Sequence, residues 1–121
     1  MSAEYEYADS ALHGAPSAAE LVEAVREWLE ADVLDGVDGR LRFHTRVAMN
    51  MLATVQRELE LGADQEQAHR DRLAALGVET ERSLADAVRA GDFDDREDEL
   101  IAALRETVVD RLRVANPRYL A

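Results

Sequence analysis

Apolar residues recur at three- and four-residue spacing along most of the chain, which is the period of an amphipathic helix. The first run follows Ser17, and the pair Ser17 and Glu20 has the spacing of a capping box. It extends to about Leu34. The second run, from Arg40 to Leu61, is the longest. We expect two helices, joined by a tight turn over residues 35–39, where glycine and aspartate favour turn conformations.

Glycines divide the pattern that follows. Gly62 is expected to stop the long helix, because glycine adopts the left-handed conformation that ends many helices. A third helix is then predicted from Asp64 to Leu76, before Gly77. A fourth is predicted from Thr80 to Ala90, before Gly91.

A fifth helix is predicted after the acidic run from Asp92 to Glu99, since carboxylates suit a helix N-terminus. It ends before Pro117, which cannot continue the hydrogen-bond ladder. No strand-like alternation and no repeat of 20 to 50 residues is visible. The sequence therefore predicts an all-α fold: a compact bundle of about five helices. We expect one domain over residues 17–121, preceded by a flexible acidic arm over residues 1–16.

Composition narrows the class of partner and compartment. The 121 residues carry a net charge of −12, which opposes binding to nucleic acid or to an anionic membrane. There is no cysteine, so no disulfide framework is possible. No run approaches the roughly 20 apolar residues of a membrane span, and the opening residues are acidic, unlike a secretory signal. We expect a cytoplasmic protein.

Catalytic signatures are scarce. The glycines match neither a dinucleotide-binding fingerprint nor a phosphate-binding loop. Glu66 and His69 have the spacing of one Glu-x-x-His pair of a di-metal bundle, but the second pair is missing. A calcium loop starting at Asp92 would need glycine and glutamate where Glu97 and Ala103 stand. No residue is predicted to be catalytic, to bind a cofactor or to hold a metal.

The long central run carries an unusual charge pattern. Between Gly39 and Arg57 there are four arginines and no acidic residue, a local charge of +4 on a strongly acidic chain. One polar face of this helix, here called the basic strip, combines Arg42, Arg46, Asn50 and Arg57. Guanidinium groups at this spacing can hold a carboxylate or a phosphate. Two readings remain open: pairing with the chain's own carboxylates, or a surface that binds a partner or an anion.

Two further side chains fall on predicted apolar faces. His44 lies near the middle of such a face, where burial requires a hydrogen-bond partner, so it is predicted to be a structural core histidine. Trp28 is likewise expected in the core rather than at a cofactor site.

Four segments together resemble the small bacterial DUF6285 family. They are PSAAEL at residues 16–21, GRLRFHTRVAMN at residues 39–50, RELELG at residues 57–62 and NPRY at residues 116–119. The resemblance extends from Ala15 to Tyr119.

The resemblance implies a role beside other enzymes. Members resemble accessory proteins that are encoded next to a phosphotransferase of the aminoglycoside-kinase type and an acyl-CoA dehydrogenase. In the pathway that this resemblance implies, the kinase phosphorylates a hydroxyacyl-CoA. We therefore expect a non-catalytic accessory subunit whose partner is the phosphotransferase-like kinase. Two alternatives remain: an independent protein that binds acyl-CoA or another anionic ligand, and a structural homo-oligomer.

Overall fold

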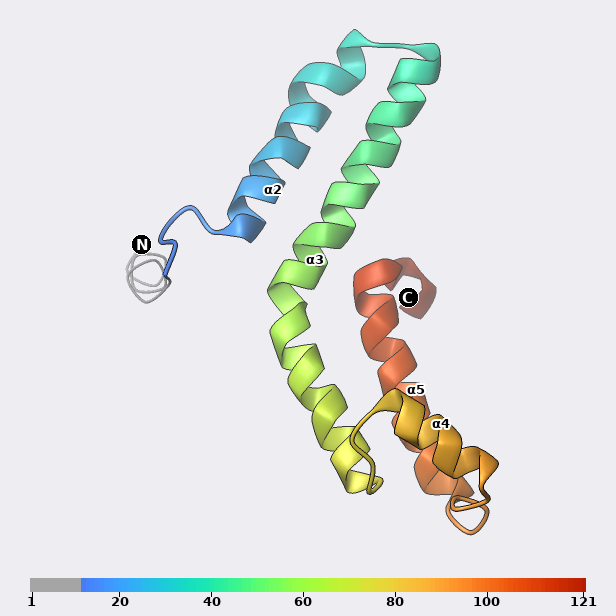
Figure 1. The fold of residues 1–121 in the computed structure, drawn as a ribbon. Coiled ribbons are helices and arrows are strands. Elements are labelled where there is room, and N and C mark those ends of the chain that lie inside the picture. The colour runs from blue at the N-terminus through green and yellow to red at the C-terminus, as the bar shows by residue number, and fades with distance from the viewer. Residues whose placement is uncertain (1–11) are drawn as a thin grey trace. The chain divides into compact units, whose positions relative to one another are not determined.

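The computed structural model describes residues 12–121, so residues 1–11 of the expected arm lie outside the described residues. Within this range the all-α class is confirmed, and no strand occurs among residues 12–121. The α-helices are α2 (Ala18–Trp28), α3 (Gly39–Ala75), α4 (Glu81–Arg89) and α5 (Glu97–Ala115) (Figure 1). Short segments complete them: a π turn η1 (Leu29–Val33) and the 3-10 turns η2 (Leu34–Gly36) and η3 (Pro117–Leu120).

The predicted capping box at the start of α2 is confirmed. The Ser17 hydroxyl accepts a hydrogen bond from the Glu20 backbone N–H at 3.2 Å, and the Glu20 carboxylate accepts one from the Ser17 backbone N–H at 3.0 Å. The backbone N–H of Ser17, and then its side chain, lower the pKa of Glu20, because both hydrogen bonds favour the ionised carboxylate. The cap satisfies amides that the first turn leaves without partners.

The predicted stop at Gly62 is wrong. α3 continues through this residue without a break, so the expected second and third helices are one, and the described residues hold four α-helices rather than five. An interior glycine costs only about 1 kcal/mol relative to alanine. The Leu, Glu, Gln and Ala residues on either side are good helix formers, and no proline follows that would force an end.

The stops at Gly77 and Gly91 are confirmed, and both use the same hydrogen-bond pattern. After α3, the N–H of Val78 donates to the carbonyl of Leu73, and the N–H of Gly77 donates to Ala74. Gly77 has φ of 85°, the left-handed conformation that this Schellman ending requires. The apolar Val78 then packs against the core, which fixes the exit of the chain.

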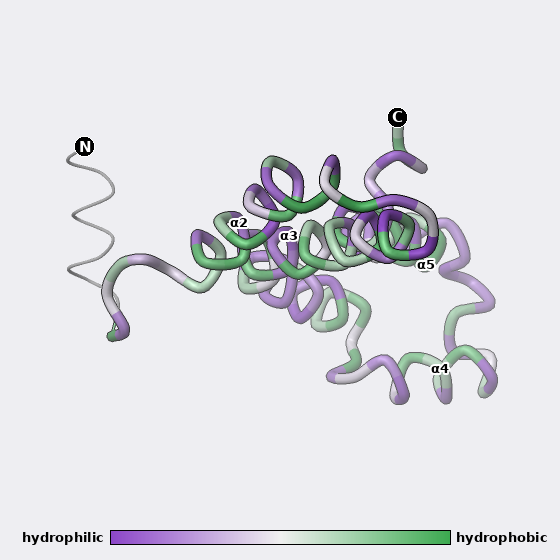
Figure 2. Tube along the Cα trace, turned by 90° about the horizontal axis from the view of Figure 1, so that it is seen from above, coloured by the Kyte–Doolittle hydropathy of each residue, from purple (hydrophilic) through white to green (hydrophobic). Residues whose placement is uncertain are grey.

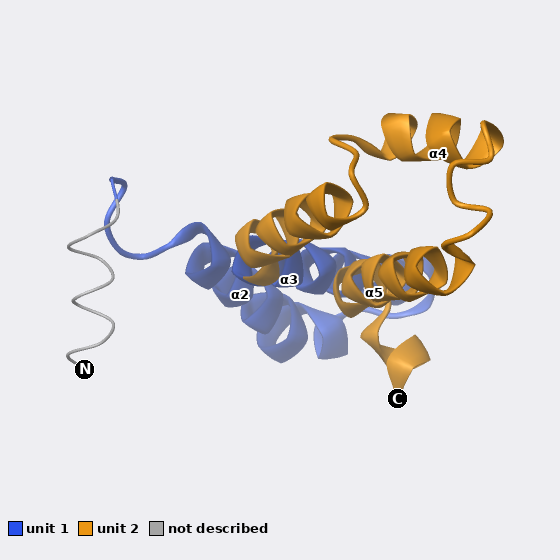
Figure 3. Cartoon of the chain, turned by 90° about the horizontal axis from the view of Figure 1, so that it is seen from below, with its two compact units in different colours: residues 1–60 blue, residues 61–121 orange. Residues whose placement is uncertain are grey.

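The chain divides into two compact units, with a boundary between Glu60 and Leu61 inside α3 (Figure 3). The single domain expected over residues 17–121 therefore stays a prediction. In unit 1, α2 and the first part of α3 form an antiparallel hairpin. Arg26 Nε donates to Gln56 Oε1 at 3.3 Å near its open end, and Arg42 Nη1 donates to the Leu34 carbonyl at 2.6 Å near the turn.

The buried apolar residues of the described chain all lie in unit 2. They are Leu73, Leu76, Leu84 and Phe93, from the end of α3, from α4 and from the loop before α5. In unit 1, Thr45 alone is buried among the described residues, and its hydroxyl donates to the Leu41 carbonyl. Within residues 12–60, unit 1 thus has two amphipathic helices but no buried apolar core.

The helices are amphipathic throughout, as the alternation of hydrophobic and hydrophilic residues along each coil shows (Figure 2). None of those in residues 12–121 has the length and hydropathy needed to cross a bilayer.

The acidic run before α5 closes over the unit 2 core. The guanidinium group of Arg96 lies 4.8 Å from the centre of the Phe93 ring and donates two hydrogen bonds to Glu99, at 3.0 and 2.9 Å. These bonds from Arg96 lower the pKa of Glu99. The run therefore starts a helix, as predicted, and also shields Phe93 from solvent.

Replacing Leu84 by alanine should lower the free energy of unfolding by about 2–5 kcal/mol, because it leaves a cavity in the small core of unit 2. Leu12→Ala is the matched control, since Leu12 is 93% exposed and its truncation should change stability by less than about 0.5 kcal/mol. Urea unfolding followed by far-UV circular dichroism measures both. Equal effects would contradict the assignment of the core.

Titration of Glu20, followed by NMR of its side-chain carboxyl carbon, should give a pKa below that of an unstructured glutamate. Because the folded state lowers this pKa, the cap stabilises α2 at pH values above the unfolded pKa. That contribution is lost as the pH falls through the folded pKa. In Ser17→Ala, the pKa of Glu20 should move part of the way back up toward its ordinary value, because the side-chain contact is lost while the backbone N–H of residue 17 remains. An unchanged pKa would show that the Ser17 hydroxyl does not act on Glu20 in solution.

Candidate functional site

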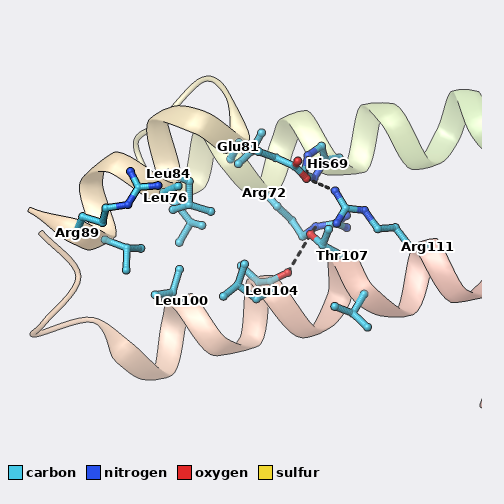
Figure 4. A pocket seen from close by; sticks show the side chains of 15 residues that line it. His69, Arg72, Leu76, Glu81, Leu84, Arg89, Leu100, Leu104, Thr107 and Arg111 are labelled. Atoms are coloured by element: carbon cyan, nitrogen blue, oxygen red, sulfur yellow. Dashed lines mark hydrogen bonds and ion pairs between the residues drawn. The ribbon is translucent and has the colours of Figure 1, made fainter. Parts of the chain in front are cut away.

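Unit 2 contains an apolar pocket of about 460 Å³ between the end of α3, α4 and α5 (Figure 4). Its walls are mainly leucine and valine side chains: Leu76 of the α3 end, Leu84 and Val88 of α4, and Leu100, Leu104 and Val108 of α5. Leu76 and Leu84 also belong to the buried core, so the floor of the pocket is the core itself. Packing of α4 and α5 on the α3 end therefore forms the pocket.

A polar cluster of three side chains closes one end of the pocket. His69 Nε2 lies 3.2 Å from Glu81 Oε1, and the guanidinium group of Arg111 donates to the same carboxylate oxygen. These residues come from α3, α4 and α5, one from each helix. Arg89 lies toward the opposite end (Figure 4), where it pairs with Asp86 at 2.8 Å. The polar groups therefore lie at the ends of the pocket and the apolar groups along its walls.

The surroundings of His69 favour one state of its ring. Its Nδ1 atom is shielded from solvent and has no hydrogen-bond partner among the described residues. We therefore assign the hydrogen to Nε2, which donates to Glu81, and the lone pair to Nδ1.

A second polar network joins α3 to α5 beside the pocket. Arg72 Nη2 lies 3.2 Å from Asp110 Oδ2, and Arg72 Nε donates to Thr107 Oγ1 at 3.2 Å. Gln65 Nε2 donates to the Asp110 carbonyl at 2.8 Å. The Arg72 and Asp110 side chains are only 15% and 19% exposed, so this pair is far less screened by solvent than the other ion pairs of unit 2. It holds the pocket walls in place.

Thr107 and His69 are each engaged by other residues of unit 2. Thr107 donates its hydroxyl to the Ala103 carbonyl and accepts from Arg72, so it is not held by a histidine base. Among residues 12–121, no group of three or more His, Cys, Asp or Glu side chains could hold a metal ion. His69 of the Glu66-x-x-His69 spacing contacts Glu81 instead.

The basic strip lies in unit 1 and shares no residue with this pocket. Arg42 donates to the Leu34 carbonyl and lies 3.5 Å from Asp35 Oδ1, so it holds the turn of its own hairpin. Arg57 donates to Thr54 Oγ1 at 3.2 Å. Arg46 and Asn50 are exposed. A role of the strip in binding stays a prediction.

The expectation that His44 and Trp28 are core residues is wrong. His44 is exposed, where its Nε2 accepts from Arg40 Nε at 3.3 Å and its ring meets Phe43 edge-on. Trp28 is 55% exposed. The apolar periodicity of both helices is real, but a hairpin of two helices covers only the side of each helix that meets the other.

The hairpin consequently leaves a set of large apolar side chains uncovered, each more than a third exposed. We call this set the open apolar face: Leu21, Val25 and Trp28 of α2, with Leu41, Met51, Val55 and Leu59 of α3.

Helical geometry places both halves of the open apolar face on one side of the hairpin. Arg26 and Gln56 mark the sides on which the two helices meet. Successive residues of an α-helix turn by about 100° around its axis. On both helices, the residues of the open apolar face are displaced from the side that meets the other helix, and the displacement is in the sense opposite to that turn. Because the helices are antiparallel, equal rotations lead to the same side. The basic strip is rotated in the opposite sense and lies across the hairpin from the open apolar face.

The cluster of His69, Glu81 and Arg111 was not predicted from the sequence. The three residues are 12 and 30 positions apart along the chain, so no local motif links them. The one available signal was helical spacing, since each of the three lies three or four positions from an apolar residue that lines the pocket.

The family model described as "Domain of unknown function (DUF6285)" matches residues 35–119, so the chain belongs to the DUF6285 family. No curated protein and no solved structure matches the chain.

Replacing Arg72 by methionine should lower the free energy of unfolding by about 1.5–3 kcal/mol, because it leaves Asp110 and Thr107 without their shielded partner. Arg89→Met is the control, since Arg89 and Asp86 form an exposed pair that should contribute less than about 1 kcal/mol. Urea denaturation measures both. If Arg72→Met is as mild as Arg89→Met, the network does not hold the pocket.

Proposed function

Taking membership of the DUF6285 family as the premise, we propose that this chain is a non-catalytic accessory subunit of an aminoglycoside-phosphotransferase-like kinase that acts on hydroxyacyl-CoA substrates in the cytoplasm. In this proposal the chain docks on the kinase through the open apolar face, and the kinase performs phosphoryl transfer. The residues that resemble the family support the identity of the partner. The exposed hairpin supports the mode of binding.

The observation that carries the proposal is the exposure of Trp28 together with its apolar neighbours on both helices of unit 1. Monomeric soluble proteins expose single apolar residues freely, but a contiguous apolar surface marks a site of association. Complete burial of one such side chain is worth about 1.5–3 kcal/mol. Covering the remaining exposed part of several side chains is therefore a substantial driving force for docking.

Trp28 is the strongest candidate anchor on this surface. Tryptophan is enriched among the residues that dominate binding energy, because it buries a large area with few rotatable bonds. It lies on α2, and Met51 of α3 is on the same side of the hairpin and is 64% exposed. Methionine adapts its shape to a partner surface. A rigid aromatic anchor beside an adaptable side chain suits a protein interface.

The basic strip would act separately from this interface, because it lies across the hairpin. Arg46 is its most accessible arginine for a partner, since Arg42 is engaged by the turn. In the accessory role, this side would face an acidic part of the kinase or the phosphates of coenzyme A. An independent protein that binds acyl-CoA or another anion would use the same arginines.

A structural homo-oligomer is the other candidate function, and the same open apolar face favours it. Two hairpins that pair by these faces around a two-fold axis would make a four-helix arrangement with a shared core. The two proposals therefore differ in the partner and agree on the surface.

Co-expression with the neighbouring phosphotransferase-like kinase should give a complex that survives purification. The double variant Trp28→Asp with Met51→Asp should weaken this complex at least about tenfold, because two carboxylates would be buried in an apolar interface. Leu12→Asp is the matched control, since Leu12 is exposed but outside the hairpin, and it should leave the affinity unchanged. Surface plasmon resonance measures the dissociation constants.

An unaffected complex in the double variant would reject the open apolar face as the docking surface. Arg46→Glu tests the basic strip in the same assay. Light scattering of the isolated chain separates the candidates: a dimer that the double variant dissociates, with no kinase bound, would favour the homo-oligomer and contradict the accessory role.

A further inference from the structure

We propose that the pocket of unit 2 is a binding site for an aliphatic chain that ends in an oxyanion, such as a carboxylate. The chain would lie against the leucine and valine walls, and the oxyanion would meet the guanidinium group of Arg111. This site lies within unit 2 and does not use the hairpin of unit 1. The inference therefore goes beyond the proposed function and does not rest on it.

The size of the pocket fits a small molecule. Its volume of about 460 Å³ lies within the range of about 300–1,000 Å³ that is typical of ligand pockets. It is about three times the roughly 150 Å³ of an apolar protein cavity that binds benzene. Two turns of a helix about 10 Å in diameter occupy roughly 850 Å³, more than this pocket holds. A single extended chain is a better match than a helix of another protein.

The side chains that line the pocket favour a ligand with an apolar chain. Leu104 of α5 lies across the pocket from Leu84 of α4 and Leu76 (Figure 4). Val88 of α4 and Val108 of α5 also line the pocket. Leu104 and Val108 remain 44% and 51% exposed. An aliphatic occupant would remove this apolar surface from water, at about 25 cal/mol per Å².

The polar end of the pocket favours a negatively charged head group. The guanidinium group of Arg111 has five N–H donors, and it donates to a single oxygen of Glu81. Its side chain is 64% exposed, so it can turn toward a ligand. Arg72 is already engaged by Asp110 and Thr107. Glu81 is the one acidic residue that lines the pocket, beside three arginines, which disfavours a cationic head group.

Straight-chain carboxylates from about six to about twelve carbons provide the test, titrated into the full chain by calorimetry below the concentration at which they form micelles. Each added methylene should raise the affinity by about fourfold, which corresponds to about 0.8 kcal/mol. The gain should stop once the chain fills the pocket. Failure to bind at any length, or a gain that continues without a plateau, would overturn the proposal.

Two pairs of neighbouring residues on α5 supply matched variants. Leu104→Asp places a carboxylate in the pocket wall and should weaken binding at least about tenfold. Ile101→Asp is its control, because Ile101 is 50% exposed but does not line the pocket. Arg111→Ala should weaken binding of the carboxylate more than Arg113→Ala, whose side chain also lies outside this pocket. Equal effects within each pair would reject the site.

The head group and its source are tested in the same assay. An alkyl trimethylammonium of equal length should bind at least about tenfold more weakly than the carboxylate. The free carboxylate and its coenzyme A thioester are compared as separate arms. The carboxylate should bind more tightly, because the thioester lacks the charged oxygen that Arg111 would meet, and tighter binding of the thioester would overturn the proposal.

Circular dichroism tests whether Leu104→Asp is folded, and light scattering measures its oligomeric state. Loss of a dimer in Leu104→Asp, with no carboxylate binding in the unmodified protein, would assign the pocket to a second copy of the chain and overturn the proposal. Binding of the kinase by Leu104→Asp separates the two proposals, since the docking surface lies on the other unit.

Discussion

Burial of the apolar side of a helix depends on the helices that pack against it, and the helices of residues 12–121 do not cover all of their own apolar sides. In unit 2, three helical segments meet, and Leu73, Leu76, Leu84 and Phe93 form a small buried core. In the described part of unit 1, two helices meet along one line, so only a part of each apolar stripe is enclosed. Trp28 is left half exposed for this reason. The difference in helix number thus separates a unit with a core from a unit with an open face.

This one constraint gives rise to two surfaces of different kinds. The open apolar face spans two helices, carries an aromatic anchor and lies across the hairpin from the charged side, which is the form expected of a protein interface. The pocket of unit 2 is bounded by three helical segments and carries its polar groups at its ends, which suits a small amphipathic molecule. The two proposals thus place a protein partner and a small ligand on separate units.

Helix boundaries were predictable where local chemistry decides them. Ser17 and Glu20 cap α2, and Gly77 ends α3, because the hydrogen bonds involved join residues a few positions apart. Gly62 looked equivalent to Gly77 in the sequence. Gly62 does not adopt the left-handed conformation that would end the helix, because the helix formers around it favour continuation. The part of α3 beyond Gly62 also makes contacts within unit 2, including the hydrogen bond from Gln65 to Asp110.

The sequence by itself determined the all-α class, the caps and the amphipathic faces, since these follow from periods of three to four residues and from local hydrogen bonds. It also placed Arg42 and Arg46 on one side of their helix. Only the tertiary structure decided which parts of each face are covered, and so exposed His44. It also brought His69 to Glu81, because residues distant in the chain meet only when helices pack. Periodicity specifies that a helix has an apolar side, whereas burial depends on how many other helices reach it.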